Sequence, residues 1–329
     1  MSHAADQRRA VLVLMLGAAA IGFAPILVRQ AFAAGIGPAA TGFWRTGLAL
    51  PALYVITRRA EGPIRLDRPP NLMALLAGLL FAADLVCWHY SIRYTSVANA
   101  TVLPNMTPIL VTAFAWVVLK ERPAPVFLLG MTAAVAGAVA VALSKSSTPG
   151  ANPHMGDALA ATTAVWYAGY VIAVRYARAD LGAASLMLWS SLVSAPVMLL
   201  AAMATGETIV PVHASDWAAL AGLGVVHVVG QGLIAWALGR LPAPVAAVVM
   251  LVQPVVAALL GWLAFGEGLA VQQALGGVLV LAGVVLAQTA ARRPTASTAA
   301  STAASTAAAP KNKKGARVSG RPRSVKEAP

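Results

Sequence analysis

Ten long apolar stretches, separated by short segments that carry proline, glycine or charge, set the pattern of this chain. A helix needs about 20 apolar residues to cross the hydrocarbon layer of a bilayer, and each stretch approaches that length. None of them alternates apolar and polar positions with a period of two, so a membrane β-barrel is not expected. The pattern predicts an all-α polytopic membrane protein. The expected spans are Ala10–Val28, Pro38–Thr57, Leu72–Ile92, Ser96–Leu119, Val126–Leu143, Gly156–Val174, Ala184–Met203, Trp217–Leu238, Ala243–Phe265 and Val271–Ala290.

A second pattern repeats at an offset of 146 residues. Apolar matches mean little in a chain so rich in Ala, Val and Leu, but a proline, a tryptophan, a glutamate and an arginine that share one offset indicate two copies of one unit. The related pairs are Pro108/Pro254, Trp116/Trp262, Glu121/Glu267, Gly130/Gly276, Gly137/Gly283, Arg29/Arg175, Gly78/Gly224, Ala100/Ala246 and, by type, Tyr90/Trp236.

The two copies predict the domain organisation. Each copy contains five spans, and because five is odd the second copy enters the membrane in the opposite orientation. We therefore expect ten transmembrane helices in two inverted five-helix repeats, residues 1–145 and 154–291, followed by a tail, residues 292–329. This plan is typical of secondary transporters, whose substrates bind near the bilayer midplane between the halves.

Composition agrees with a membrane protein and locates the excess charge. Only 11% of the residues are charged, against roughly 25% in soluble domains, and the mean hydropathy is +0.75. The net charge is +13, of which the low-complexity tail from Arg292 onward contributes +8. We expect a disordered tail that acts as a solvated topology anchor or is attracted to anionic lipid. No motif for nucleic-acid binding accompanies its charge. The single cysteine, Cys87, excludes an intrachain disulfide.

The orientation follows from Lys and Arg in the short loops. The N-terminus resembles a secretory signal, but its apolar run is longer than a usual signal core, so we interpret it as an uncleaved first span. With the N-terminus inside, eleven basic residues before the tail face the cytoplasm, and only Arg29, Arg93 and Lys145 face outward. Both termini are then cytoplasmic, with Glu121 at the inner surface and Glu267 at the outer one.

The second half of each copy resembles a known family. Residues 94–100 (YTSVANA) lead into 105–109 (NMTPI) and 120–123 (KERP), and their counterparts are 241–247 (LPAPVAA), 253–255 (QPV) and 266–267 (GE). This pattern is similar to the EamA-type branch of the drug/metabolite transporter superfamily. The resemblance implies the ten-span inverted-repeat fold, a bacterial inner membrane, and export of amino acids or related metabolites. It also implies that spans one to four and six to nine surround the pathway, with spans five and ten outside.

Arg45 and Asp84 are the only charged residues placed well inside the predicted spans. A central charge costs at least about 2.5–3.5 kcal/mol on insertion scales, so each needs a partner or water. Their depths match, which permits a direct ion pair, and the second copy has Ser190 near the first position and Gly230 at the second. A structural pair and a transport role both stay open. In the second case Arg45 attracts a carboxylate, and Asp84 senses protons or receives an amino group.

Further candidates are neutral polar and aromatic groups placed near the midplane. His227 and Gln231 share one helix face, and His227 is a second candidate for proton coupling or a neutral packing residue. Pro108 and Pro254 predict symmetry-related kinks, because proline removes a helical hydrogen bond. The aromatic residues pack in the core or stack on an aromatic or cationic substrate. The predicted substrate-binding residues are Arg45, Asp84, Trp88, Asn105, Trp166, Tyr170, His227, Gln231 and Gln253.

The function that fits best is a secondary exporter of small zwitterionic metabolites, amino acids first, working by alternating access and open to proton coupling. The alternatives are an exporter of aromatic or cationic drug-like compounds and a passive facilitator or channel. Enzyme motifs such as His-Glu-x-x-His, a phosphate loop or Gly-x-Ser-x-Gly do not occur in the sequence, so no enzymatic activity, cofactor or metal is expected. The expected partners are a small-molecule substrate and the lipid bilayer, not nucleic acid.

Overall fold

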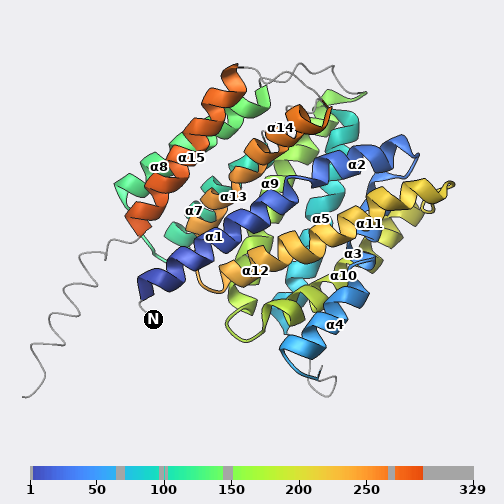
Figure 1. Cartoon of the computed structure of the whole chain (residues 1–329), viewed down its shortest axis with the longest axis horizontal. Helices are drawn as coiled ribbons and strands as arrows, with labels where there is room; N and C mark the ends of the chain where they lie inside the picture. The colour runs from blue at the N-terminus through green and yellow to red at the C-terminus, as the bar shows by residue number, and fades with distance from the viewer. Residues whose placement is uncertain are drawn as a thin grey trace, which may run out of the picture. The chain divides into compact units, whose positions relative to one another are not determined.

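The computed structural model describes residues 3–63, 71–95, 100, 103–143, 151–265 and 271–291, and every regular element in these ranges is helical (Figure 1). An apolar segment that lies in hydrocarbon forms a helix because only its own backbone can pair its N–H and C=O groups. The elements are α1 His3–Ile21, α2 Ala24–Ala33, α3 Pro38–Gly47, α4 Leu50–Ala60, α5 Leu72–Tyr94, η1 Pro104–Met106, α7 Thr107–Val117, α8 Pro125–Leu143, α9 Pro153–Ala177, α10 Ala183–Ala204, η2 Ala214–Asp216, α11 Trp217–Val226, η3 His227–Gln231, α12 Gly232–Leu238, α13 Ala243–Met250, α14 Val252–Phe265 and α15 Val271–Ala291.

Several helices continue one another across short breaks, so the described elements follow the ten predicted spans in order. The first span is α1 with α2, interrupted at Gly22 and Phe23, and the second is α3 with α4. The fourth contains the 3₁₀-helix η1 and α7. In the eighth, the π-helix η3 separates α11 from α12, and in the ninth Leu251 separates α13 from α14. The sequence predicted continuous apolar spans and did not predict the breaks in the first, second and eighth.

Five helical segments of the described chain are long and apolar enough to cross a membrane. They are Ala5–Ala33, Leu72–Tyr94, Pro153–Ala177, Ala183–Ala204 and Ala214–Leu238, and the shorter apolar helices are Pro125–Val141, Ala243–Ala257 and Ala274–Ala290. The prediction of an all-α polytopic membrane protein is therefore confirmed. Glu267 and the tail from residue 292 lie outside the described residues, so the predictions made for them stay predictions.

Two glutamates reveal the inverted symmetry of the halves. At the end of α10, Glu207 accepts hydrogen bonds from the backbone N–H groups of Ala39 (3.2 Å) and Ala40 (2.8 Å), in the first turn of α3. At the end of α4, Glu61 accepts them from Ala184 (2.9 Å) and Ser185 (3.0 Å), in the first turn of α10. Each half thus caps a helix N-terminus of the other half, where a carboxylate is favoured by the unpaired N–H groups and the helix dipole.

These two glutamate caps lie at opposite membrane surfaces. Helix α10 has 22 residues, which at about 1.5 Å per residue spans about 33 Å, close to the thickness of the hydrocarbon core. Its N-terminus is capped by Glu61, and Glu207 follows its C-terminus. Glu61 and Glu207 also share the 146-residue offset. The seam that α3 and α4 form with α10 therefore has a hydrogen-bonded glutamate cap at each end.

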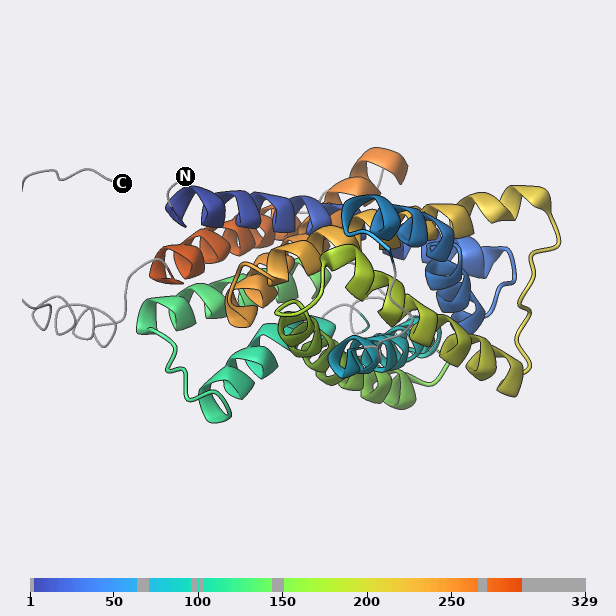
Figure 2. The same cartoon turned by 90° about the horizontal axis from the view of Figure 1, so that it is seen from below.

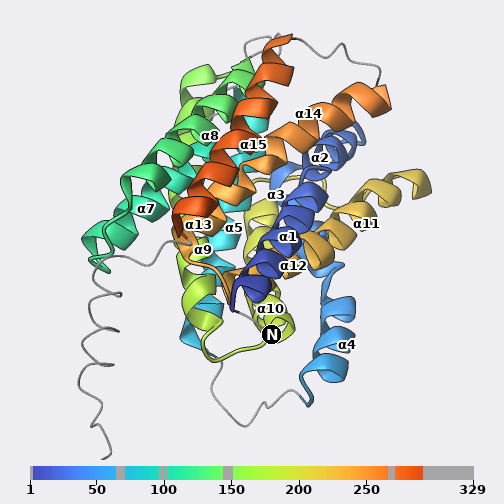
Figure 3. The same cartoon turned by 60° about the vertical axis from the view of Figure 1, so that its left-hand side comes forward.

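Helices α8 and α15 lie side by side in two views of the bundle (Figures 2 and 3). Their glycines allow the two backbones to touch: a Cβ atom added at Gly137 would lie 2.6 Å from the carbonyl oxygen of Gly276, and one at Gly276 would lie 2.8 Å from that of Gly137. Gly130 and Gly283 face each other in the same reciprocal way. Small residues drive this kind of close helix packing in membranes. Among the described residues of this pair, Val141 is the one that lines the cavity described below.

Candidate functional site

A cavity of about 200 Å³ lies between the two halves. It is lined by α1, α2, α3, α5, η1 and α7 from the first half and by α9, η3, α13 and α14 from the second, with Val141 of α8 at its edge. Its lining reaches Arg29 in α2 and Ile92 near the C-terminal end of α5, whereas no lining residue on α5 precedes Phe81. The cavity therefore extends towards the membrane side where α5 ends, which the distribution of Lys and Arg predicts to be the outer side.

Arg45 is the buried cation of this cavity. It lies in the last turn of α3, is 2% exposed, and its guanidinium carbon lies 5.7 Å from the centre of the Phe81 ring. Its Nε atom is buried and has no hydrogen-bond partner within the described residues. A buried guanidinium with an unused donor is costly in a low-dielectric environment. Arg45 therefore has binding capacity left for a ligand in the cavity.

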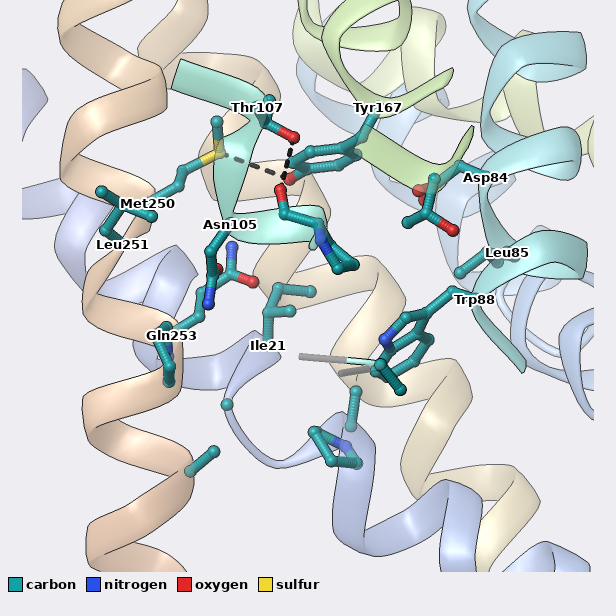
Figure 4. A pocket seen from close by; sticks show the side chains of 18 of the residues that line it. Ile21, Asp84, Leu85, Trp88, Asn105, Thr107, Tyr167, Met250, Leu251 and Gln253 are labelled. Atoms are coloured by element: carbon teal, nitrogen blue, oxygen red, sulfur yellow. Dashed lines mark hydrogen bonds between the residues drawn. The ribbon is translucent and has the colours of Figure 1, made fainter. Parts of the chain in front are cut away.

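Asp84 supplies the opposite charge from the middle of α5. It is 6% exposed and lines the same cavity, where Figure 4 shows it on the side of Trp88, across from Asn105 and Gln253. Arg45 and Asp84 act on each other electrostatically, but in the described chain no nitrogen of Arg45 lies within the 4.0 Å of an Asp84 oxygen that an ion pair requires. Their equal depth permitted a direct ion pair, and the structure does not form it.

Amide and hydroxyl groups line the opposite wall. Asn105 comes from η1 and Gln253 from the first turn of α14, so equivalent segments of the two halves place them together (Figure 4). The buried Nδ2 atom of Asn105 has no partner among the described residues. The Tyr167 hydroxyl group donates to the sulfur of Met250 at 3.3 Å. This wall offers uncharged donors and acceptors to a ligand whose charged ends face Arg45 and Asp84.

An aromatic cluster packs behind the cavity wall at Phe81, the lining residue of α5 that lies farthest from Ile92. We call Phe81, Tyr170 and His227 the aromatic floor: the Phe81 ring centre lies 4.9 Å from that of Tyr170 and 5.3 Å from that of His227. Tyr170 is 1% exposed, and its hydroxyl group donates to Oε1 of Gln231 at 3.3 Å. His227 is 1% exposed, and its Nε2 lies 2.9 Å from the hydroxyl oxygen of Ser191. Tyr170 and His227 are thus buried side chains that pack against the Phe81 wall of the cavity.

Helix breaks place backbone groups against the cavity. Pro108 lies in the first turn of α7 and Pro254 in the first turn of α14, each directly after an irregular segment, and both line the cavity. Gly22 marks the break between α1 and α2 and lines it as well. Non-helical backbone at membrane depth is tolerated where it borders protein or a water-filled cavity. In transporters such broken helices form the binding site.

The structure brings most of the predicted site residues together. Those that line the cavity are Arg45, Asp84, Trp88, Asn105, Gln231, Gln253, Pro108 and Pro254. Tyr170 and His227 lie behind the wall in the aromatic floor. Trp166 is 37% exposed and is not part of the lining. His89 on the same helix as Asp84 and Trp88 is buried and does not line the cavity; its Nδ1 atom lies 2.8 Å from the carbonyl oxygen of Pro38.

The sequence did not single out four other lining residues as site candidates. Phe81, Thr163 and Tyr167 occupy positions in apolar helices that equally suit core packing. Arg29 was counted as an outer loop residue, although its match with Arg175 was visible. The unusual feature that marks Arg29 is its place four residues after Pro25, on a helix that begins inside the bundle.

A comparison with family models identifies the fold. The model of the EamA-like transporter family matches the chain twice, over residues 8–143 and 154–289. This chain belongs to the EamA-like transporter family. It is therefore a membrane transporter with ten transmembrane helices in two inverted five-helix repeats. The predicted recognition and fold class are confirmed, and the coarser part of the predicted function, a transporter rather than an enzyme, is supported.

Curated relatives of this EamA-like transporter include the pseudopaline exporter CntI of Pseudomonas aeruginosa, from strains UCBPP-PA14 and PAO1. Each is 28% identical over 285 residues, which cover 85% of this chain and 96% of the relative. A protein crystal structure superposes with a TM-score of 0.73 at 20% identity, covering 88% of this chain and 100% of the other. At that identity the structural likeness supports the fold alone.

Proposed function

We propose that this EamA-like transporter is a secondary exporter of small zwitterionic metabolites, with amino acids as the first candidates, and that it works by alternating access. The observation that carries the proposal is the pair of buried, oppositely charged side chains, Arg45 and Asp84, which line one cavity without pairing with each other. A zwitterion satisfies both at once: its carboxylate binds the guanidinium and its ammonium group binds the carboxylate. Buried charges in membrane segments are costly unless they serve such a role.

The size of the cavity supports small metabolites over drug-like compounds. Its volume of about 200 Å³ lies below the roughly 300–1,000 Å³ of pockets that hold drug-sized ligands. The aromatic side chains that line it, Phe81, Trp88 and Tyr167, also suit the apolar part of an amino acid. The alternative of an aromatic or cationic substrate needs no buried Arg45, since a cation would be repelled by it.

The aromatic floor supports alternating access over a channel. Tyr170 and His227 each pack against Phe81, the lining residue of α5 that lies farthest from Ile92, and both are buried. In an inverted-repeat protein the two halves can exchange their conformations, which gives one state open to each side of the membrane. The export direction is supported by the relatives, which are exporters. Asp84 and His227 are our candidates for proton coupling.

Counterflow in proteoliposomes tests the proposal. Vesicles loaded with an unlabelled amino acid are diluted into medium that contains the same amino acid in labelled form, across a panel of amino acids, aromatic amines and organic cations. A carrier gives transient accumulation of label, which a channel does not. We expect accumulation with a zwitterion and its loss in Arg45→Gln and Asp84→Asn. Accumulation of organic cations alone, or uptake without stimulation by internal substrate, would contradict the proposal.

A further inference from the structure

The charged groups of the cavity do not balance. Among the residues that line it in the described chain, three are charged: Arg29 and Arg45 are cations and Asp84 is the one anion. A neutral zwitterion neutralises Arg45 and Asp84 and leaves Arg29 unused. A ligand whose charges complement all three side chains is favoured over one that complements only two, because electrostatic complementarity across a site selects between ligands.

The break in the first span adds a second source of positive potential. Helix α2 begins at Ala24 inside the bundle, and no side chain caps its N-terminus. Gly22, Ala24, Pro25 and Ile26 all line the cavity, so the first turn of α2 faces it. The N–H groups of a first helical turn have no partners within the helix, and the helix dipole places partial positive charge there. Broken helices of transporters present such ends to anionic substrate groups.

Arg29 extends this positive end along one face. It follows Pro25 by four residues, so the two residues lie on the same side of α2, about 6 Å apart along the helix axis. Arg29 is exposed, whereas Arg45 is 2% exposed with its Nε atom unpartnered, so the cavity has one cation near its mouth and one at its base. The buried, unpartnered Nδ2 atom of Asn105 is a further donor in the same lining. Together these donors exceed what a single carboxylate accepts.

We infer that the cavity prefers anionic amino acids, with one ammonium group and two carboxylates, over neutral ones. Asp84 binds the ammonium group, Arg45 binds one carboxylate, and the N-terminus of α2 with Arg29 binds the second. This inference rests on the proposed function and specifies the substrate class of the same site. It makes Arg29 a specificity-determining residue, although the equivalent position of the second half, Arg175, does not line the cavity.

Matched acid and amide pairs test the inference. L-glutamate and L-glutamine have nearly the same shape and differ by one charge, and so do L-aspartate and L-asparagine. Counterflow in proteoliposomes gives the ratio of acid to amide transport for the wild-type chain, for Arg29→Gln and for Arg93→Gln. Arg93 is the control because it is also exposed and lies next to Ile92 at the C-terminal end of α5, but it does not line the cavity. We expect the wild-type ratio to exceed one and Arg29→Gln to lower it about tenfold, as for the loss of one charged hydrogen bond.

The outcomes separate this inference from the proposed function. Amides transported at least as well as acids by the wild-type chain would overturn the anionic preference and leave a zwitterion exporter in place. An equal fall of the ratio in Arg93→Gln would overturn the specific role of Arg29, because general surface charge would then explain the effect. Failure of all four amino acids, with transport of organic cations instead, would overturn both. A fall of the ratio in Arg29→Gln alone would support the second carboxylate site.

Discussion

A charged side chain at the centre of a bilayer costs at least about 2.5–3.5 kcal/mol on insertion scales, and this chain has two such side chains on facing helices. A structural ion pair would offset that cost, but Arg45 and Asp84 do not form one in the described chain. Their charge is instead directed at a cavity lined by Trp88, Tyr167 and Gln253. Selection for a ligand, rather than for stability, explains an arrangement that leaves a buried donor unused.

Replacing Asp84 with Asn tests whether the Asp84 carboxylate serves a ligand rather than stability. The substitution keeps the shape and removes the charge, so it removes the partner that we propose for the ammonium group of the substrate. We expect amino-acid counterflow to fall at least about thirtyfold, the equivalent of about 2 kcal/mol for a charged hydrogen bond. The thermal unfolding temperature in detergent stays equal or rises, because a buried charge is gone.

Asp180→Asn is the matched control for Asp84→Asn. Asp180 is exposed just beyond α9 and accepts a hydrogen bond from the side chain of Asn71 at 3.4 Å. Its substitution is expected to leave counterflow within about twofold, since exposed polar interactions contribute little. Normal counterflow in Asp84→Asn, with normal expression, would refute a binding or proton-coupling role for this carboxylate. A fall accompanied by unfolding would instead indicate a structural role.

At the scale of helices, the periphery of the bundle depends on close backbone contact. A Cβ atom at Gly137 would lie 2.6 Å from the carbonyl oxygen of Gly276 and 2.7 Å from the backbone nitrogen of Val280, so α8 and α15 must separate to admit a methyl group. We expect Gly137→Ala to destabilise the protein by about 1–3 kcal/mol, as overpacking does. Thermal unfolding in detergent measures the change.

Gly232→Ala provides the control for this packing argument. Gly232 begins α12, and a Cβ atom built there meets nothing within 4 Å. Alanine is the better helix former by about 1 kcal/mol, so this substitution is expected to leave the unfolding temperature unchanged or to raise it. Equal destabilisation by both substitutions would show that helix propensity, not the contact between α8 and α15, governs the first result.

The sequence predicted the spans and the buried charges but not how the helices meet. Arg45 and Asp84 stood out because charge is rare in apolar runs, and the 146-residue offset indicated the inverted halves. Tyr167 could not be separated from Tyr170, since an aromatic residue that lines a cavity and one that packs beneath it have the same neighbours in sequence. Glu61 and Glu207 share the offset as well, yet glutamates in loops usually face solvent. Only their hydrogen bonds to the other half reveal their role.

At the scale of the whole molecule, the two glutamate caps indicate which contact persists during transport. Glu61 and Glu207 both cap a helix of the opposite half in the same structure, in which the cavity extends towards the side where α5 ends. In an inverted-repeat carrier, the other access state follows when the two halves exchange conformations. After this exchange, the Glu61 cap takes the geometry that the Glu207 cap has here, and the Glu207 cap takes that of Glu61. Both caps are therefore present in the other access state too. The seam of α3 and α4 with α10 is then a fixed frame, around which the other helices move.

Neutral substitutions at the two caps test this frame. Glu207 is half-buried and also accepts a hydrogen bond from the Tyr90 hydroxyl group, whereas Glu61 is exposed. We therefore expect Glu207→Gln to cost about 1–2 kcal/mol of stability and Glu61→Gln less than about 1 kcal/mol, as for helix caps of different exposure. Thermal unfolding in detergent measures both. If the caps were gates, each substitution would instead favour one access state.

Thiol labelling decides between a frame and a pair of gates. Cys87 is the single native cysteine, so Cys87→Ser gives a cysteine-free chain, and Ile92→Cys then places a thiol in the cavity lining at the end of α5. A membrane-impermeant maleimide added to one face of oriented vesicles reports how often the cavity opens there. With a fixed frame, the labelling rate stays within about twofold in Glu61→Gln and Glu207→Gln, because neither cap breaks when access changes. Gates would shift the two rates in opposite directions, since losing the outer contact exposes the thiol and losing the inner one hides it.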